Sequence, residues 1–234
     1  MAPRYDGISD ADLEAFKQLD TCILSDALES FDVRLKNQGY TRPGLRCMTG
    51  NFDPIVGYAV TARVRSSEPP VLGHSYAAHH DWWHSVEAVP QPRIAAIQDI
   101  DPEPGTGACV GQVAAAIFQA MHFVGVVTNG SARDLPALTE MQLPVFARHV
   151  SPSHSYAHIV DHSQPVEICG LVIRAGDLLM ADRHGVVSIP PELVHELPQL
   201  AHDLLRRKRK FAEFCRSREF SPDRLAHEVS QLKP

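Results

Sequence analysis

Hydrophobic residues recur along this chain with two different periods, and each period predicts a different kind of element. A spacing of three to four residues indicates helices, whereas alternation or a short continuous apolar run indicates strands. The expected helices cover 10–19 (capped by Ser9), 23–31, 76–86, 111–121, a long terminal segment opened by Pro190 and Pro191, and a last one capped by Ser221. The expected strands cover 55–64, 93–100, 124–128, 144–148, 166–174, 177–181 and 186–189. This order predicts a mixed α/β fold with βαβ units in the middle and a separate β layer after residue 165.

No composition break divides the chain into two domains. The sequence contains no Gly/Ser tract, no Gln/Asn run and no fixed-period repeat. We therefore expect a single domain over residues 1–234, with a core at about 20–190 and a C-terminal helical extension at 191–234. Peripheral helices are expected at both ends.

The charge balance argues against direct nucleic-acid binding. The formal net charge is −6, whereas nucleic-acid binding needs a basic surface that releases counterions from phosphates. One basic run, 206–210, lies in a helical pattern. A solvent-exposed helix face explains this run better than a nucleic-acid or targeting patch does.

The cysteines and the apolar runs predict a soluble cytoplasmic protein that does not bind membranes. The five cysteines form no CxxC pair and no zinc spacing, which favours reduced thiols. The N-terminus lacks a signal pattern, and no apolar run approaches the roughly 18 residues that a membrane span needs.

The segment from Gly111 to Asp134 offers the most chemistry. Gly111 opens a predicted helix, and the first N–H groups of a helix attract anions because they have no intrahelical partner. The next buried strand is expected to stop at the Asn129-Gly130 turn, shortly before Arg133 and Asp134. Arg133 could hold a substrate carboxylate, and Asp134 could supply an oxygen ligand to Mg²⁺ or Mn²⁺. From spacing alone, a surface ion pair with a helix cap explains the pair at least as well.

Three motifs in a fixed order add to this interpretation. They are GVVTNGSARD at 125–134, LPVFAR at 143–148 and GLVIRAGDLLMADRHGVVSIP at 170–190. In these motifs the chain resembles the RraA-like family, which groups the regulator of ribonuclease E activity with 4-hydroxy-4-methyl-2-oxoglutarate and 4-carboxy-4-hydroxy-2-oxoadipate aldolases. A weaker similarity extends back to the predicted helix around residues 25–28.

The resemblance implies a swivelling β/β/α-type fold assembled as a homotrimer or as a dimer of trimers, a homohexamer. It also implies that Arg133 and Asp134 bind pyruvate and the divalent metal. The backbone amides of Gly111, Gln112, Val113 and Ala114 would lie against the substrate carboxylate and carbonyl.

Gln112 departs from the aldolase pattern, which has an acidic residue twenty-one positions before the arginine. Glutamine can hydrogen-bond a water or a substrate oxygen, but it cannot serve as a charged proton acceptor. Binding of a 2-oxo acid therefore survives this substitution better than complete aldolase chemistry does. The regulator branch of the family also lacks the acid, so Gln112 does not by itself separate an enzyme from a binding protein.

Two functions follow from these residues together with the resemblance. The first is a class II, metal-dependent carbon–carbon lyase, either an aldolase or an oxaloacetate-type decarboxylase, in which Arg133, Asp134 and Gln112 support a pyruvate enolate. Aldol cleavage also needs a base for the substrate hydroxyl; the sequence nominates no side chain, which leaves a hydroxide bound to the metal. The second function is a non-catalytic regulator that binds a protein such as an RNA-degrading enzyme.

Histidines gather in two further segments, 74–84 and 149–162. His80 and His84 are four residues apart and could share a helix face, but a zinc site would need a third ligand, and packing beside Trp82 and Trp83 or a subunit contact is favoured. The histidines at 149, 154, 158 and 162 are expected in a loop and a strand, where any of them could line a pocket.

Overall fold

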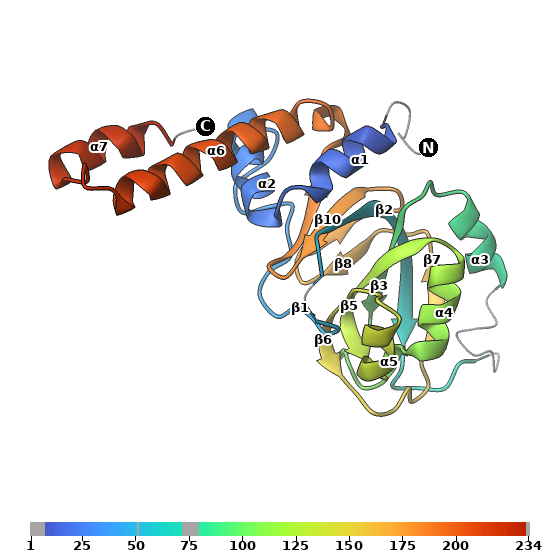
Figure 1. Cartoon of the computed structure of the whole chain (residues 1–234). Coiled ribbons are helices and arrows are strands. Elements are labelled where there is room, and N and C mark those ends of the chain that lie inside the picture. Colours follow the sequence, from blue (N-terminus) through green and yellow to red (C-terminus); the bar gives the residue numbers. More distant parts are fainter. Residues whose placement is uncertain (1–7, 51, 72–79, 233–234) are drawn as a thin grey trace.

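The computed structural model describes residues 8–50, 52–71 and 80–232, and places helices around a central sheet (Figure 1). The helices are α1 (Asp10–Lys17), α2 (Thr21–Leu28), α3 (His80–Glu87), α4 (Gln112–Ala120), α5 (Leu135–Glu140), α6 (Leu197–Arg216) and α7 (Pro222–Ser230), with 3-10 turns η1 (Glu29–Phe31) and η3 (Pro191–Leu193). The strands are β1 (Arg46–Cys47), β2 (Ile55–Arg65), β3 (Arg93–Asp99), β4 (Ala108–Val110), β5 (Phe123–Ala132), β6 (Val145–Val150), β7 (His158–His162), β8 (Val166–Ile168), β9 (Leu171–Ile173), β10 (Leu178–Asp182) and β11 (Gly185–Ile189). The predicted mixed α/β class is confirmed.

Parallel strands form the centre of the main sheet, and antiparallel strands extend it. The order is β1-β6-β5-β3-β2-β10-β11, with β4 also paired to β5 and β7 to β2. The parallel pairs β2–β3, β3–β5 and β5–β6 require crossovers, and α3, α4 and α5 lie in those connections. The sheet is nearly closed and barrel-like, and β8 packs against β2, β3 and β5.

Both faces of the central sheet are buried, so its strands are almost continuously apolar. Along β3, Ala95 and Ile97 belong to the core that includes α3 and α4, whereas Ile94 and Ala96 belong to the core that includes the β8–β9 hairpin. Strands covered on both faces lose the alternation of polar and apolar residues. This is why 93–100 is recognisable in the sequence as a buried strand.

The predicted turn at Asn129-Gly130 is wrong, because β5 continues through both residues to Ala132. The Asn129 side chain accepts a hydrogen bond from the Asp99 N–H at 2.7 Å and donates one to the Asp99 carbonyl at 2.8 Å, as a neighbouring strand would. Gly130 permits a close approach, since a Cβ there would lie 3.0 Å from Cβ of Asp99. The pairing of β5 with β6 shifts register here, so the irregularity is a bulge inside a strand.

Two other boundaries differ from the prediction. The single strand expected at 166–174 is the hairpin β8–β9, whose loop holds Cys169 at φ 48° and Gly170 at φ 80°. The prolines expected to open the long terminal helix instead precede and begin η3. Helix α6 starts later and carries Pro198 in its first turn, where the missing N–H costs nothing.

The N-terminal caps agree with the prediction, and the terminal helices lie at the periphery. Ser9 accepts a hydrogen bond from the Asp12 N–H at the start of α1, and Ser221 caps α7 in the same way. Helix α3 overlaps the helix predicted at 76–86, although residues 76–79 lie outside the described residues. Among the helices described, none is long and apolar enough to cross a membrane.

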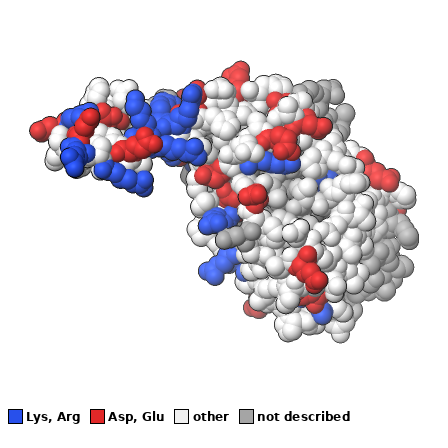
Figure 2. All heavy atoms as spheres, viewed as in Figure 1, with Lys and Arg blue, Asp and Glu red and all other residues white. Residues whose placement is uncertain are grey.

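The C-terminal helices form an arm that leaves the body of the molecule (Figure 1). Leu197, Ala201 and Leu204 of α6 are buried, and α6 packs on α2. None of residues 222–230, all of them described, is buried. Lys and Arg side chains gather over α6, as Figure 2 shows, so the basic run 206–210 lies on a largely exposed helix face as predicted.

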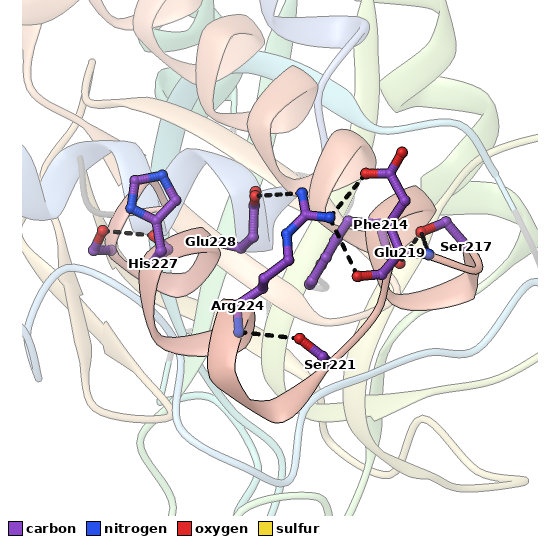
Figure 3. A network of polar contacts seen from close by, with 8 residues as sticks. Phe214, Ser217, Glu219, Ser221, Arg224, His227 and Glu228 are labelled. Atoms are coloured by element: carbon purple, nitrogen blue, oxygen red, sulfur yellow. Dashed lines mark hydrogen bonds and ion pairs between the residues drawn. The ribbon is translucent and has the colours of Figure 1, made fainter.

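Arg224 joins the two helices of this arm (Figure 3). Its Nη1 donates to a carboxylate oxygen of Glu219 at 2.9 Å, and its Nη2 lies 3.8 Å from an oxygen of Glu228. The guanidinium carbon stands 5.3 Å from the centre of the Phe214 ring, which belongs to α6. These contacts substitute for the buried apolar surface that α7 lacks.

Replacing Arg224 with alanine should therefore loosen α7 and leave the sheet unchanged. Exposed ion pairs and cation–π contacts each contribute about 0.5–1 kcal/mol. We expect amide hydrogen exchange in residues 222–230 to rise about tenfold, with no change in β3 or β5. Arg218→Ala is the control, since Arg218 has no ion pair within the described part of the chain. Equal exchange rates in the two variants would contradict the role given to Arg224.

Candidate functional site

A cavity of about 380 Å³ opens beside the start of α4 and the end of β5. Three segments far apart in the sequence form its walls: the turn from β4 into α4, the residues that follow β5, and the loop that follows β6. The lining residues are Ala108, Cys109, Gly111, Gln112, Val113, Ala114, Arg133, Asp134, His154 and Ala157. All six residues that the sequence nominated thus line the same cavity.

Strand pairing brings two of these walls together. β4 and β5 are parallel neighbours, so their carboxyl ends meet at the same edge of the sheet. The Arg133 N–H donates to the Val110 carbonyl at 2.8 Å, and Gly111 is the N-cap of α4. The amide-rich start of α4 therefore lies beside Arg133 and Asp134.

Asp134 has an uncommon backbone conformation for a residue other than glycine, with φ 56° and ψ 35°. Its carboxylate accepts a hydrogen bond from the Gln112 N–H at 3.1 Å and another from Nε of Arg133 at 3.2 Å. The Gln112 amide, followed by Arg133, holds the pKa of the Asp134 carboxyl below its usual value. Because the side chain is 36% exposed, an ionised oxygen remains accessible.

The metal-ligating side chains that line the cavity are few. Within the described residues, no group of three or more His, Cys, Asp or Glu side chains could hold a metal ion, so a closed zinc site has no basis there. A single ionised carboxylate fits Mg²⁺ or Mn²⁺, which typically keep several waters and take further oxygens from the substrate. Asp134 is the lining residue that could hold such an ion.

Two further lining residues have an apolar and a thiol side chain. Val113 lies in the apolar pattern of α4, yet it is 72% exposed and lines the cavity. Cys109 also lines the cavity, but burial raises the pKa of its thiol to about 12. Its sulfur stays protonated at neutral pH, so Cys109 is not a nucleophile.

The histidine-rich segments separate in the structure. His149 and His162 lie at opposite ends of the 149–162 segment, in β6 and β7, and only His154 of the described histidines lines the cavity. His84 is exposed and stands 3.8 Å from Glu87, while the side chain of His80 lies outside the described residues. The sequence offered His154 as one of four equivalent candidates, and nothing in its spacing distinguished it.

Comparison with known proteins gives a match to a family model and similarity to individual proteins. Residues 21–188 match the family model described as RraA-like: Aldolase/RraA. A protein of Halalkalibacterium halodurans named "Putative 4-hydroxy-4-methyl-2-oxoglutarate aldolase" is 29% identical over 178 residues, which cover 75% of this chain and 74% of that protein. An uncharacterized protein of Methanocaldococcus jannaschii is 30% identical over 90 residues; this match covers 38% of this chain and 43%, less than half, of that protein.

The fold resembles the crystal structure of Streptomyces coelicolor RraAS2, described as an unusual member of the RNase ES inhibitor RraA protein family. The TM-score is 0.68 at 19% sequence identity, and the likeness covers 92% of this chain and all of the other. At this identity the likeness concerns the fold alone.

Proposed function

This chain belongs to the RraA-like family, and from that premise we propose that it is a metal-dependent carbon–carbon lyase that acts on a small 2-oxo acid. The observation that carries the proposal is that Arg133, Asp134 and the start of α4 line the same cavity. The name of the Halalkalibacterium halodurans relative supports an aldolase activity.

Each lining group has a position that suits one role. Arg133 directs Nε to Asp134, which leaves its two terminal nitrogens to bind the substrate C1 carboxylate. The Gln112 N–H already donates to Asp134, so we assign the N–H groups of Val113 and Ala114 to the C2 oxygen, where negative charge develops as the bond from C3 breaks. One such donor is typically worth ~10²–10³ in rate. Mg²⁺ or Mn²⁺, when held by Asp134, supplies a Lewis acid for the same charge. Gln112 can hydrogen-bond a substrate oxygen but cannot act as a base.

The deciding experiment measures pyruvate. The full chain is mixed with Mg²⁺ or Mn²⁺ and with a panel that includes oxaloacetate and 4-hydroxy-4-methyl-2-oxoglutarate. Reactions with metal alone correct for spontaneous decarboxylation, and a chelator should abolish the enzymatic part. No pyruvate above the metal blank with any substrate would remove the lyase proposal.

We further propose that the chain assembles as a trimer or as a dimer of trimers. The α6–α7 arm supports an assembly, because Phe220 and Val229 are each 44% exposed and α7 buries none of its described residues against the body. Light scattering should give three or six times the chain mass of 25.8 kDa. A mass of one chain would contradict the assembly.

The same arm favours a second candidate function, a non-catalytic regulator that binds a protein partner such as an RNA-degrading enzyme. Its exposed Phe220 and Val229 and its Lys and Arg side chains (Figure 2) offer a contact surface, and no residue of the arm lines the cavity. This function predicts that the chain inhibits a purified ribonuclease of the E type. The degree of inhibition should be the same whether or not the chain was first stripped of divalent metal with a chelator. An unchanged ribonuclease rate would rule it out.

A further inference from the structure

We propose that His154 is the base of the aldol cleavage, and that Nε2 of its ring takes the proton from the C4 hydroxyl of a bound 4-hydroxy-2-oxo acid. The inference rests on the lyase function proposed above and supplies the group for which the sequence nominated no side chain. His154 lines the cavity, its Nδ1 lies beside a backbone carbonyl, and its loop is hydrogen-bonded to the other walls.

The place of His154 complements the other lining groups. Arg133, Asp134 and the start of α4 form two walls, whereas His154 and Ala157 come from the loop after β6 and form the third. With the C1 carboxylate on Arg133, we place the far end of the substrate at the remaining wall, which His154 and Ala157 form. Among the described lining residues, His154 is the one that carries an imidazole, the side chain that serves most often as a general base.

The backbone determines the tautomer of the ring. Nδ1 of His154 lies 2.7 Å from the carbonyl oxygen of Ser155. A carbonyl oxygen only accepts hydrogen bonds, so Nδ1 must carry the proton and donate it. In the neutral ring Nε2 then holds the lone pair, which is the form that a general base requires.

Backbone hydrogen bonds hold the loop of His154 against the rest of the cavity. The Ala108 N–H donates to the Ser153 carbonyl at 2.9 Å, and the Tyr156 N–H donates to the Ser66 carbonyl at 3.2 Å. The approach is so close at Gly107 that a Cβ there would lie 2.4 Å from the His154 carbonyl oxygen. A base held in this way needs little reorganisation before it reacts.

The proposed step balances without a further reactant. Nε2 accepts the C4 hydroxyl proton, the C4 oxygen becomes a carbonyl oxygen, and the C3–C4 bond breaks. The electron pair of that bond passes to the C2 oxygen and leaves the pyruvate enolate. The imidazolium then returns its proton to C3, which yields pyruvate and the neutral base.

Decarboxylation of oxaloacetate provides the test, because that reaction has no hydroxyl proton to remove. His154→Asn should lower kcat/KM for cleavage of 4-hydroxy-4-methyl-2-oxoglutarate by about 10²–10⁴-fold. It should change oxaloacetate decarboxylation by less than about threefold, since water can protonate the enolate. His158→Asn is the matched control: Nδ1 of His158 also bonds a carbonyl, that of Tyr156 at 2.7 Å, but the residue is outside the lining set.

The outcomes separate the two proposals. An equal loss of both reactions in His154→Asn, or no loss of cleavage, overturns the role of His154 while the lyase function stands. If the unaltered protein makes no pyruvate from either substrate, the lyase function fails. Nitrogen-15 NMR of the full chain then still decides the placement: oxalate with Mg²⁺, a stand-in for the enolate, should shift the Nε2 signal of His154 and not that of His158. An unchanged His154 signal overturns the inference.

Discussion

Asp134→Asn is expected to lower kcat/KM for pyruvate formation by about 10³-fold with little effect on stability. The substitution removes the negative charge that would hold the metal and leaves the shape of the side chain unchanged. Asparagine tolerates the left-handed backbone at φ 56°, and its side-chain oxygen can still accept the Gln112 N–H. The loss should therefore come from the charge and not from a disturbed fold.

Two measurements test this expectation. Mn²⁺ binding, followed by its electron paramagnetic resonance signal, should weaken in parallel with pyruvate formation, and the melting temperature should stay within a few degrees. Asp32→Asn serves as control, because Asp32 is also left-handed, at φ 50°, and exposed, but is not among the residues lining the cavity. Full activity in Asp134→Asn would exclude Asp134 as the metal ligand.

Gly111→Ala is expected to reduce kcat/KM by about 10²-fold for a steric reason. An added Cβ would lie 2.8 Å from Oδ2 of Asp134 and 2.9 Å from Cγ of Arg133, so both side chains must move. A displacement of about 1 Å in a positioning group can cost about 10²-fold in rate. The backbone itself is extended at φ −150°, which alanine adopts readily.

Gly111→Ala should disturb the geometry of the site without destabilising the fold. We expect unfolding in urea to change by less than about 1 kcal/mol, since the clash involves partly exposed side chains that can shift. A KM that rises together with a falling kcat would show that both the carboxylate contact and the chemical step depend on this position. An active enzyme with normal kinetics would mean that Arg133 and Asp134 need not occupy their observed positions.

Local sequence was sufficient to nominate the two walls of the cavity that hold Arg133, Asp134 and the start of α4. Each wall is a short continuous segment, and a helix start or a strand end carries its chemistry within a few residues. The third wall could not be found in this way. His154 reaches the cavity through hydrogen bonds between its loop and residues 66 and 108, and no local pattern records those contacts.

By itself, the sequence determined the class of the fold, the positions of most helices and strands and the family motifs, because hydrophobic period and capping are properties of neighbouring residues. Only the tertiary structure decided where those elements are interrupted and what each exposed side chain meets. Asn129 continues a strand because its partner, Asp99, is 30 residues away in the sequence. Val113 is exposed for the same kind of reason: the start of α4 borders a cavity whose other walls come from distant segments.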